Sequence, residues 1–424
     1  MKILGLHADL FFIGGHTRLF ISMCDLFKGV GYNVKVVTRW AKKDCVDFPI
    51  EHVMPFNPEF VKTLPPERRT VTVKSEMHLF QYNLHTMKHY QPIRHLTSRD
   101  VSMMPIPIVN INGFYGGQFP EEVYKLCEES DYVFTDTELF VSLCSVLPVQ
   151  DKQIMYVHFP PTNLKPIKGK EPAFIWANSK FTKKWIKKRW GVDAWKNTEV
   201  VNPFVYCDDY DPSPAWEERP YDCVMFARLG QDKFSGVADY LNDHFGLLAM
   251  GSQATSKQAP DYTPPGTLHK NLTLEQIRAF LSHSKVYVHG KGFYMKLSPK
   301  MKTATAKKKK GSPLTEDDKR TIECATSRTS QRLEEHFGLT ILEAMSSACP
   351  VVVPRRGGPW SDVTDRGKYG LGYSSLKELH KHVSRLISDK AYWTEWSNKA
   401  LEGAKRFDAP VTAERVKELL EAKK

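Results

Sequence analysis

Short apolar runs alternate with amphipathic segments along the first half of the chain. Lys2–His7 is an apolar run, and Thr17–Val30 carries apolar residues at helical spacing until Gly29 and Gly31 end it. Asn33–Thr38 then predicts a second strand, and such a strand–helix–strand unit implies a parallel sheet. Further buried strands of the same α/β domain are predicted at Ile106–Ile111, Tyr132–Thr135, Ile154–His158, Phe174–Ala177 and Glu199–Val201.

A second series of apolar runs follows the polar, proline-rich stretch Asp208–Pro220. Its predicted strands are Cys223–Ala227, Phe245–Met250, Lys285–His289 and Val351–Val353, and three helical patterns follow from Ser374. We therefore predict an α/β fold of two Rossmann-like, doubly wound domains that face each other across a cleft. The expected domains are residues 1–203, residues 204–390 with a basic insertion at 290–333, and C-terminal helices at 391–424 that pack back across the domains. Ligands of open α/β sheets bind beyond the carboxyl ends of the strands, so the cleft is the expected site.

The composition is that of a soluble globular enzyme, with 41% hydrophobic and 25% charged residues among 424. No apolar run approaches the length of about 18 residues that spans a bilayer. The opening MKILGL lacks the apolar core of a signal peptide, and the eight cysteines form no C-x-x-C pair. These features predict a reduced, cytoplasmic protein without a zinc site.

The net charge of +12 is concentrated in two segments. Pro160–Val200 holds ten Lys or Arg against three Asp or Glu, and Lys291–Arg332 holds twelve against four. The rest of the chain is slightly acidic. Such local basicity indicates anionic partners, which include phosphates, nucleic acid and membrane surfaces.

The most informative constellation is the segment from Glu335 to Glu343, which leads into an apolar helical run and then a strand. Backbone N–H groups of the residues Phe337, Gly338, Leu339 and Thr340 would lie at the helix start, which favours a phosphate. Glu335 stands just before the helix, where its carboxylate can reach a sugar hydroxyl. Glu343 lies about two turns further on and can accept hydrogen bonds from a ribose diol. The alternative is a capped surface helix with two solvated glutamates.

Three further segments follow predicted strands. Arg228 and Lys233 come after Cys223–Ala227 and can clamp a diphosphate, although alone they resemble ordinary surface cations. Gly14 and Gly15 in the first strand-to-helix loop let the backbone approach a ligand, or simply form a tight turn. His158 closes a strand before two prolines, where a structural and a functional histidine are equally reasonable interpretations.

Together these segments resemble the retaining GT-B glycosyltransferases of the family 4 type, also called glycosyl transferases group 1. The E-x7-E pair, the R-x4-K pair and the glycine pair match this family, and so does the N-S-x-F-T string within Ala177–Thr182. Val200–Pro203 looks like the family's interdomain entry. The string Tyr156–Pro160 is most similar to mannosyltransferases that assemble lipid-linked oligosaccharides.

The resemblance implies a role for each of these residues. Arg228 and Lys233 would neutralise the diphosphate of a nucleotide sugar, helped by Gly14, Gly15 and the helix start at Phe337–Thr340. Glu335 and His158 would act at the transferred sugar, and Glu343 would hold the ribose. Fixed cations would replace Mg²⁺, so no metal and no cofactor beyond the nucleotide-sugar co-substrate is expected. Retention by front-face attack follows from the family.

The acceptor is open, because two segments depart from the family pattern. About forty residues, Gly290–Leu333, separate the strand from Glu335, and Thr63–Ser102 fits no pattern. A basic amphipathic helix at Ser179–Trp190 can lie on an anionic membrane, while the lysines of Lys291–Lys310 suit a nucleic-acid backbone. Three hypotheses remain: a hexosyltransferase acting on a lipid-linked or membrane-associated glycan, one acting on nucleic acid, and a catalytically silent GT-B binding module.

Overall fold

The computed structural model describes two compact units. Unit 1 holds Met1–Pro203 and Ala409–Lys424, and unit 2 holds Phe204–Gln253 and Gln258–Asp408. Within them the described residues are 1–7, 15–38, 50–52, 70–75, 78–83, 88–94, 108–110, 121–136, 149–158, 160, 172–227, 234, 236–251, 263–270, 272–293, 307, 312–313, 315 and 334–422.

Unit 1 is built on a seven-stranded parallel sheet with the strand order β3-β2-β1-β8-β9-β10-β11. Its strands are β1 (Lys2–His7), β2 (Asn33–Thr38), β3 (Ile50–His52), β8 (Tyr132–Thr135), β9 (Gln153–Val157), β10 (Phe174–Ala177) and β11 (Thr198–Val200). Its helices are α1 (Gly15–Gly29), α4 (Glu121–Glu129), α6 (Lys180–Trp190), α7 (Val192–Lys196) and α16 (Ala409–Glu421). The predicted helix at Thr17–Val30 and the parallel sheet are confirmed.

The two faces of this sheet are covered by different helices because successive side chains of a strand point to opposite faces. Phe20 of α1 stacks on Phe134 of β8, with 5.5 Å between ring centroids. On the other face, Ile186 of α6 packs with Met155 of β9 and Ile175 of β10. The sheet is therefore doubly wound, as predicted.

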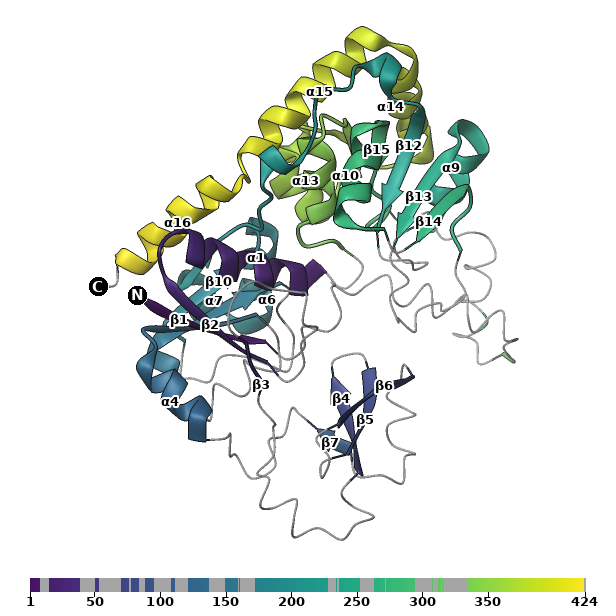
Figure 1. Cartoon of the computed structure of the whole chain (residues 1–424). Coiled ribbons are helices and arrows are strands. Elements are labelled where there is room, and N and C mark those ends of the chain that lie inside the picture. The colour runs from purple at the N-terminus through teal and green to yellow at the C-terminus, as the bar shows by residue number, and fades with distance from the viewer. Residues whose placement is uncertain are drawn as a thin grey trace. The chain divides into compact units, whose positions relative to one another are not determined.

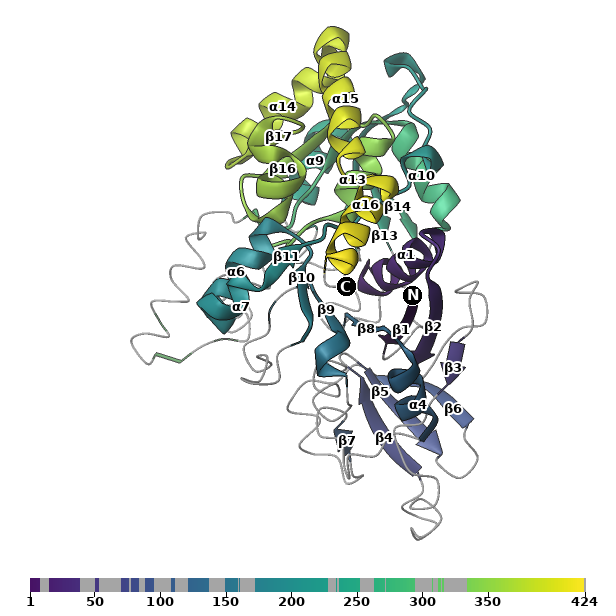
Figure 2. The ribbon, with the colours of Figure 1, turned by 90° about the vertical axis from the view of Figure 1, so that its left-hand side faces the viewer.

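Helix α16 returns to unit 1 from the far end of the chain and lies beside α1 (Figures 1 and 2). The Tyr132 hydroxyl donates to the Leu420 carbonyl at 3.4 Å, and Arg415 pairs with Glu199 at 2.8 Å. Unit 1 is thus completed by residues that follow the whole of unit 2 in sequence.

A second, four-stranded sheet of unit 1 has the order β6-β5-β4-β7. The strands are β4 (Thr70–Ser75), β5 (His78–Asn83), β6 (Lys88–Arg94) and β7 (Ile108–Asn110). The strand predicted at Ile106–Ile111 exists as β7, but it pairs in parallel with β4 and is not part of the main sheet. An apolar run predicts a strand without specifying its partner, which explains the difference.

Unit 2 contains a six-stranded parallel sheet of order β14-β13-β12-β15-β16-β17. The strands are β12 (Tyr221–Phe226), β13 (Leu247–Gly251), β14 (Thr267–Lys270), β15 (Ser284–Val288), β16 (Val351–Pro354) and β17 (Leu371–Tyr373). The helices are α9 (Val237–Phe245), α10 (Leu274–Ser282), α13 (Leu339–Ser346), α14 (Leu376–Ser388) and α15 (Lys390–Lys405).

Alternate residues of the unit 2 strands enter two separate cores. Val286 and Val352 pack with Leu379 of α14 on one face. Tyr287 and Val351 pack on the other face, with helices α10, α13 and α15. This alternation makes unit 2 doubly wound as well, with α9 and α13 on opposite sides of the strands in Figure 1.

A fully buried guanidinium fixes the start of unit 2. Arg219 donates Nε to the Pro214 carbonyl at 3.0 Å, Nη1 to Ser284 at 3.0 Å and Nη2 to Ser347 at 2.9 Å. Its guanidinium carbon lies 4.9 Å from the centroid of the Trp393 ring. One side chain therefore joins the entry segment, the start of β15 and the end of α13.

Candidate active site

The carboxyl edge of the unit 2 sheet has its topological switch point between β12 and β15, where chain connections leave in opposite directions. Ligands of open α/β sheets bind at such points. Arg228 and Lys233 follow β12 directly in sequence, and both lie outside the described residues, as do Gly14 and the run Lys308–Lys310. The diphosphate clamp by Arg228 and Lys233 stays a prediction.

The Tyr287 hydroxyl joins three elements at this switch point. It donates to the Phe226 carbonyl at the end of β12, at 3.1 Å, and pairs with Thr340 Oγ1 on α13 at 2.8 Å. Burial raises the pKa of Tyr287, so this hydroxyl stays protonated and remains a donor. The first turn of α13 is thereby held against the ends of β12 and β15.

Helix α13 begins at Leu339, inside the predicted start at Phe337–Thr340. Gly338 caps the helix with φ of +104°, and a Cβ there would lie 2.7 Å from Ile341 Cδ1. Phe337 is buried against Phe407, with 5.4 Å between ring centroids, so only its backbone is available to a ligand. A helical first turn leaves N–H groups without a carbonyl partner within the helix, although here the Ile341 N–H donates to the carbonyl of the cap residue Gly338 at 3.1 Å. This turn lies at the switch point.

Glu335 lies just before this helix and forms an ion pair with Lys291. The distance from Lys291 Nζ to Glu335 Oε2 is 3.6 Å, and the side chains are 14% and 22% exposed. Lys291 follows β15, so the pair joins the carboxyl end of this strand to the segment that leads into α13. The sequence had placed Lys291 only within a basic insertion, because 44 positions separate it from Glu335 and no local pattern connects them.

Glu343 lies on the inner side of α13 and has no exposed surface. Tyr210 donates its hydroxyl to Glu343 Oε1 at 3.4 Å, and Arg278 lies over the Tyr210 ring, 5.2 Å from its centroid. The alternative interpretation of Glu343 as a solvated surface residue is therefore wrong. The carboxylate is covered by other parts of the chain, and its contact with a ribose stays a prediction.

Two glycines after β16 were missed in the sequence. The Gly358 N–H donates to the Glu335 carbonyl at 2.9 Å, and a Cβ on Gly358 would lie 1.9 Å from the His336 carbonyl oxygen. A Cβ on Gly357 would lie 2.5 Å from the Glu335 carbonyl oxygen. Only glycines permit this loop to support the Glu335 backbone. Two adjacent glycines shortly after a buried strand, separated from it by Arg355 and Arg356, were the available signal.

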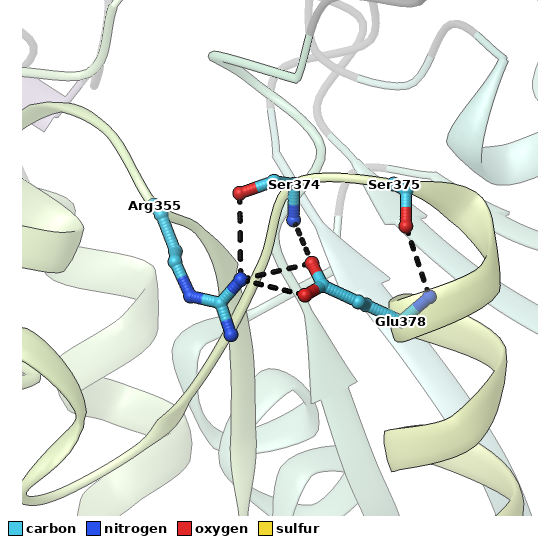
Figure 3. A network of polar contacts seen from close by, with 4 residues as sticks. All are labelled: Arg355, Ser374, Ser375 and Glu378. Atoms are coloured by element: carbon cyan, nitrogen blue, oxygen red, sulfur yellow. Dashed lines mark hydrogen bonds and ion pairs between the residues drawn. The ribbon is translucent and has the colours of Figure 1, made fainter.

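A polar network anchors the same loop to the following helix (Figure 3). Arg355 Nη1 donates to both carboxylate oxygens of Glu378 at 2.9 Å, and Glu378 also accepts the Ser374 N–H at 2.7 Å. The Arg355 hydrogen bond lowers the pKa of Glu378. Ser375 caps α14 by accepting the Glu378 N–H at 3.2 Å. Arg355 and Glu378 are 39% and 40% exposed, so their pairing contributes less than about 1 kcal/mol.

In unit 1, Gly15 begins α1, and His158 follows β9. The N-S-x-F-T segment supports the His158 backbone. Thr182 Oγ1 lies 3.3 Å from the His158 carbonyl, and Ser179 caps α6 by accepting the Thr182 N–H at 2.9 Å. The Asn178 N–H donates to the Val157 carbonyl at 3.2 Å. This motif therefore fixes where the chain leaves β9.

The basic helix predicted at Ser179–Trp190 is observed as α6. Ile186 is buried, whereas Trp185 is half-buried. Lys188 Nζ lies over the Trp185 ring, 4.3 Å from its centroid. Lys187 Nζ lies over the ring of Trp195 in the adjoining α7, 4.4 Å from the ring centroid. The exposed side of these two helices thus combines cations with indole rings.

The comparisons with known proteins agree with this geometry. Residues 319–403 match the family model described as Glycosyl transferases group 1. A sucrose synthase of Denitrovibrio acetiphilus is 36% identical over 91 residues, which are 20% of this chain and only 12% of that enzyme. The chain therefore spans a small part of this curated relative.

Solved structures resemble the chain over its full length. Anabaena HepE, with UDP and glucose bound, has a TM-score of 0.61 at 14% identity, with 100% of both chains covered. WaaG, a glycosyltransferase involved in lipopolysaccharide biosynthesis, has a TM-score of 0.54 at 11% identity, with 99% of both chains covered. The chain has the GT-B fold. Its second unit contains the segment that matches the model of glycosyl transferases group 1, and together these findings support a glycosyltransferase.

The described residues contain neither a membrane-spanning helix nor a metal-binding cluster. No helix there is long and apolar enough to cross a membrane. No cluster of three or more His, Cys, Asp or Glu among them is placed to hold a metal ion. Independence from metals stays a prediction.

Proposed function

We propose that the chain is a retaining, metal-independent hexosyltransferase that uses a nucleoside-diphosphate sugar. The observation that carries this proposal is the first turn of α13 at the switch point of unit 2, with Glu335 and Lys291 beside it. A helix start favours the diphosphate, and a carboxylate fixed by a cation can accept hydrogen bonds from sugar hydroxyls. UDP and glucose bound to HepE support a UDP-hexose as the first donor to test.

The donor test is a thermal-shift screen of the full chain against UDP- and GDP-hexoses. One nucleotide sugar should raise the melting temperature, because a ligand that binds the folded state stabilises it. Glu335→Gln should keep donor binding and lose most transfer. Glu334→Gln, one residue earlier in the same segment, is the matched control and should behave like the parent. If no nucleotide sugar shifts the melting temperature, the proposed function is wrong.

The acceptor that we propose is an anionic or membrane-associated glycan or lipid. The support is the exposed side of α6 and α7, where Lys184, Lys187 and Lys188 are exposed and Trp185 and Trp195 are half-buried. Lysines attract anionic headgroups and indole rings favour the membrane interface. WaaG, whose reaction belongs to lipopolysaccharide biosynthesis, shares this fold.

A nucleic-acid acceptor is the second candidate, and one observation weighs against it. Phe293 is an aromatic residue of the Lys291–Lys310 segment that could stack on a base, but its ring packs on Tyr373 with 5.1 Å between ring centroids. Liposome flotation and a DNA mobility shift, each at several salt concentrations, separate the two candidates. Lys184→Glu with Lys188→Glu should abolish flotation on anionic liposomes. The same change at Lys377 and Lys381, exposed lysines of α14, is the control. DNA binding without flotation would favour the second candidate.

A further inference from the structure

Three titratable side chains meet at the carboxyl edge of the unit 1 sheet. His7 ends β1, Asp136 follows β8, and His158 follows β9, and these three strands are neighbours. The switch point of this sheet lies between β1 and β8, because the connections leave in opposite directions there. Of the three residues, only His158 was singled out in the sequence.

Asp136 lies between the two histidines. Its Oδ1 is 3.6 Å from His7 Nε2, and its Oδ2 is 3.5 Å from His158 Nε2. The side chains of His7 and Asp136 are each 1% exposed, whereas that of His158 is 18% exposed. The cluster therefore has a buried part, made of Asp136 and His7, and one member that reaches the surface.

Burial decides which atoms carry protons. A carboxylate removed from water costs several kcal/mol unless donors face it, so Asp136 requires N–H groups from its neighbours. His158 can supply one only from Nε2, the nitrogen that faces Asp136. In a neutral imidazole one nitrogen donates and the other accepts, so Nδ1 of His158 is then the acceptor.

Contacts with neighbouring described residues hold both histidines in place. The His158 ring meets the Tyr156 ring edge-on, with 5.3 Å between centroids. The backbone carbonyl of His158 accepts a hydrogen bond from the Thr182 hydroxyl. The His7 ring packs on Phe20 with 4.6 Å between centroids. Because His7 faces the second oxygen of Asp136, the carboxylate cannot rotate without losing one of the two contacts.

We propose that Asp136, buttressed by His7, is a positioning residue that fixes His158 as the Nε2–H tautomer, so that Nδ1 accepts a hydrogen bond from a substrate hydroxyl. The inference rests on the proposed function for the identity of that substrate, which is the hydroxyl of a sugar or of its acceptor. Asp136 acts through His158 and does not touch the substrate. Asparagine at 136 would present an amide N–H to the imidazole and select the opposite tautomer.

The first test is the tautomer itself in the full-length wild-type chain. Long-range ¹H–¹⁵N spectra of ¹⁵N-histidine-labelled protein distinguish the two neutral forms, and loss of one signal set in His158→Gln assigns it. We expect the neutral Nε2–H form, with no proton on Nδ1. An imidazolium at neutral pH would count against the proposal, because both of its nitrogens are donors and Nδ1 could not accept a hydrogen bond. A neutral Nδ1–H form of His158 would overturn the proposal, whether or not any substituted protein folds.

The second test is transfer by Asp136→Asn. We expect kcat to fall by about 100-fold or more, with the donor KM changed less than about twofold, because hydrogen-bonding and proton-transfer groups contribute roughly this factor. Asp151→Asn, at the exposed amino end of β9, is the matched control and should retain kcat. Unchanged kcat in folded Asp136→Asn would refute the positioning role alone. If the wild-type chain neither binds nor uses any nucleotide sugar, the proposed function is wrong. The NMR measurement of the His158 tautomer still decides whether Asp136 positions His158.

Discussion

The Tyr287 hydroxyl and Thr340 Oγ1 lie 2.8 Å apart and connect β15 to the first turn of α13. The same hydroxyl donates to the end of β12. Two strands and the helix start that we assign to the donor therefore meet at one oxygen atom.

Removal of this oxygen in Tyr287→Phe should cost about 1–2 kcal/mol of unfolding free energy, which is a few degrees in melting temperature. Donor affinity should also fall by about fivefold, because the helix start loses its attachment. Ser397→Ala is the control, since it removes a buried hydroxyl that donates to the Ala348 carbonyl beyond the other end of α13. Thermal unfolding compares the stabilities of the two variants, and calorimetric titration with the donor compares their donor affinities. Equal loss of affinity in the two variants would contradict a local role for Tyr287.

Lys291→Met should lower kcat by about tenfold and leave the melting temperature almost unchanged. The pair with Glu335 is partly exposed, so it contributes little to stability, but it orients the carboxylate beside the proposed sugar. Lys285→Met breaks a similar pair with Asp222 at the amino end of the same strand. Steady-state kinetics should show the loss only for Lys291. A change confined to the donor KM would argue against orientation of Glu335.

Arg219→Lys should destabilise unit 2 by about 3 kcal/mol, since an ammonium cannot reach three carbonyls that a planar guanidinium spans. Arg278→Lys, at a pair with the exposed Asp209, serves as the control and should cost less than about 1 kcal/mol. Urea unfolding monitored by tryptophan fluorescence compares them. Similar midpoints would mean that the buried guanidinium is dispensable.

His382 gives unit 2 a dependence on pH. Burial, and next the charge of Arg355, lower the pKa of His382 in the folded state. The unfolded chain therefore binds more protons as pH falls below the ordinary histidine value of about 6.5, and stability decreases there. The lowered pKa of Glu378 acts in the same direction, but only below about pH 4.3.

His382→Gln should accordingly flatten the decline in melting temperature between pH 7 and pH 5. The exposed His244 of α9 provides the comparison through His244→Gln, which should leave the slope as it is. Parallel slopes for parent and His382→Gln would show that another group titrates.

Treatment with EDTA should leave transfer unchanged, because the proposed mechanism assigns neutralisation of the diphosphate to Arg228, Lys233 and the α13 helix start. Chelated and dialysed protein would be assayed with and without added Mg²⁺. Recovery of lost activity by Mg²⁺ would show that a metal supplies the charge.

The sequence predicted those features that depend on local pattern. An apolar run predicted buried strands such as Cys223–Ala227. Gly338, followed by apolar residues at helical spacing, predicted the helix start at Phe337–Thr340. Strand β14 was missed because its four residues are half-buried or exposed and carry no apolar alternation. Asp136 and His7 are 129 positions apart, and only the pairing of β1 with β8 brings them together. Contacts of this kind depend on strand order, which one sequence does not display.

The return of α16 to unit 1 has a consequence for synthesis on the ribosome. Residues 409–421 are translated after every residue of unit 2, yet they cover part of α1 and contact β8 and β11 through Leu420 and Arg415. The described residues of unit 2 all lie between Phe204 and Asp408, so this unit can fold as soon as Asp408 has emerged. Unit 1 must wait with an incomplete apolar face, although it is made first. Nascent chains arrested before residue 409 should therefore bind chaperones through unit 1.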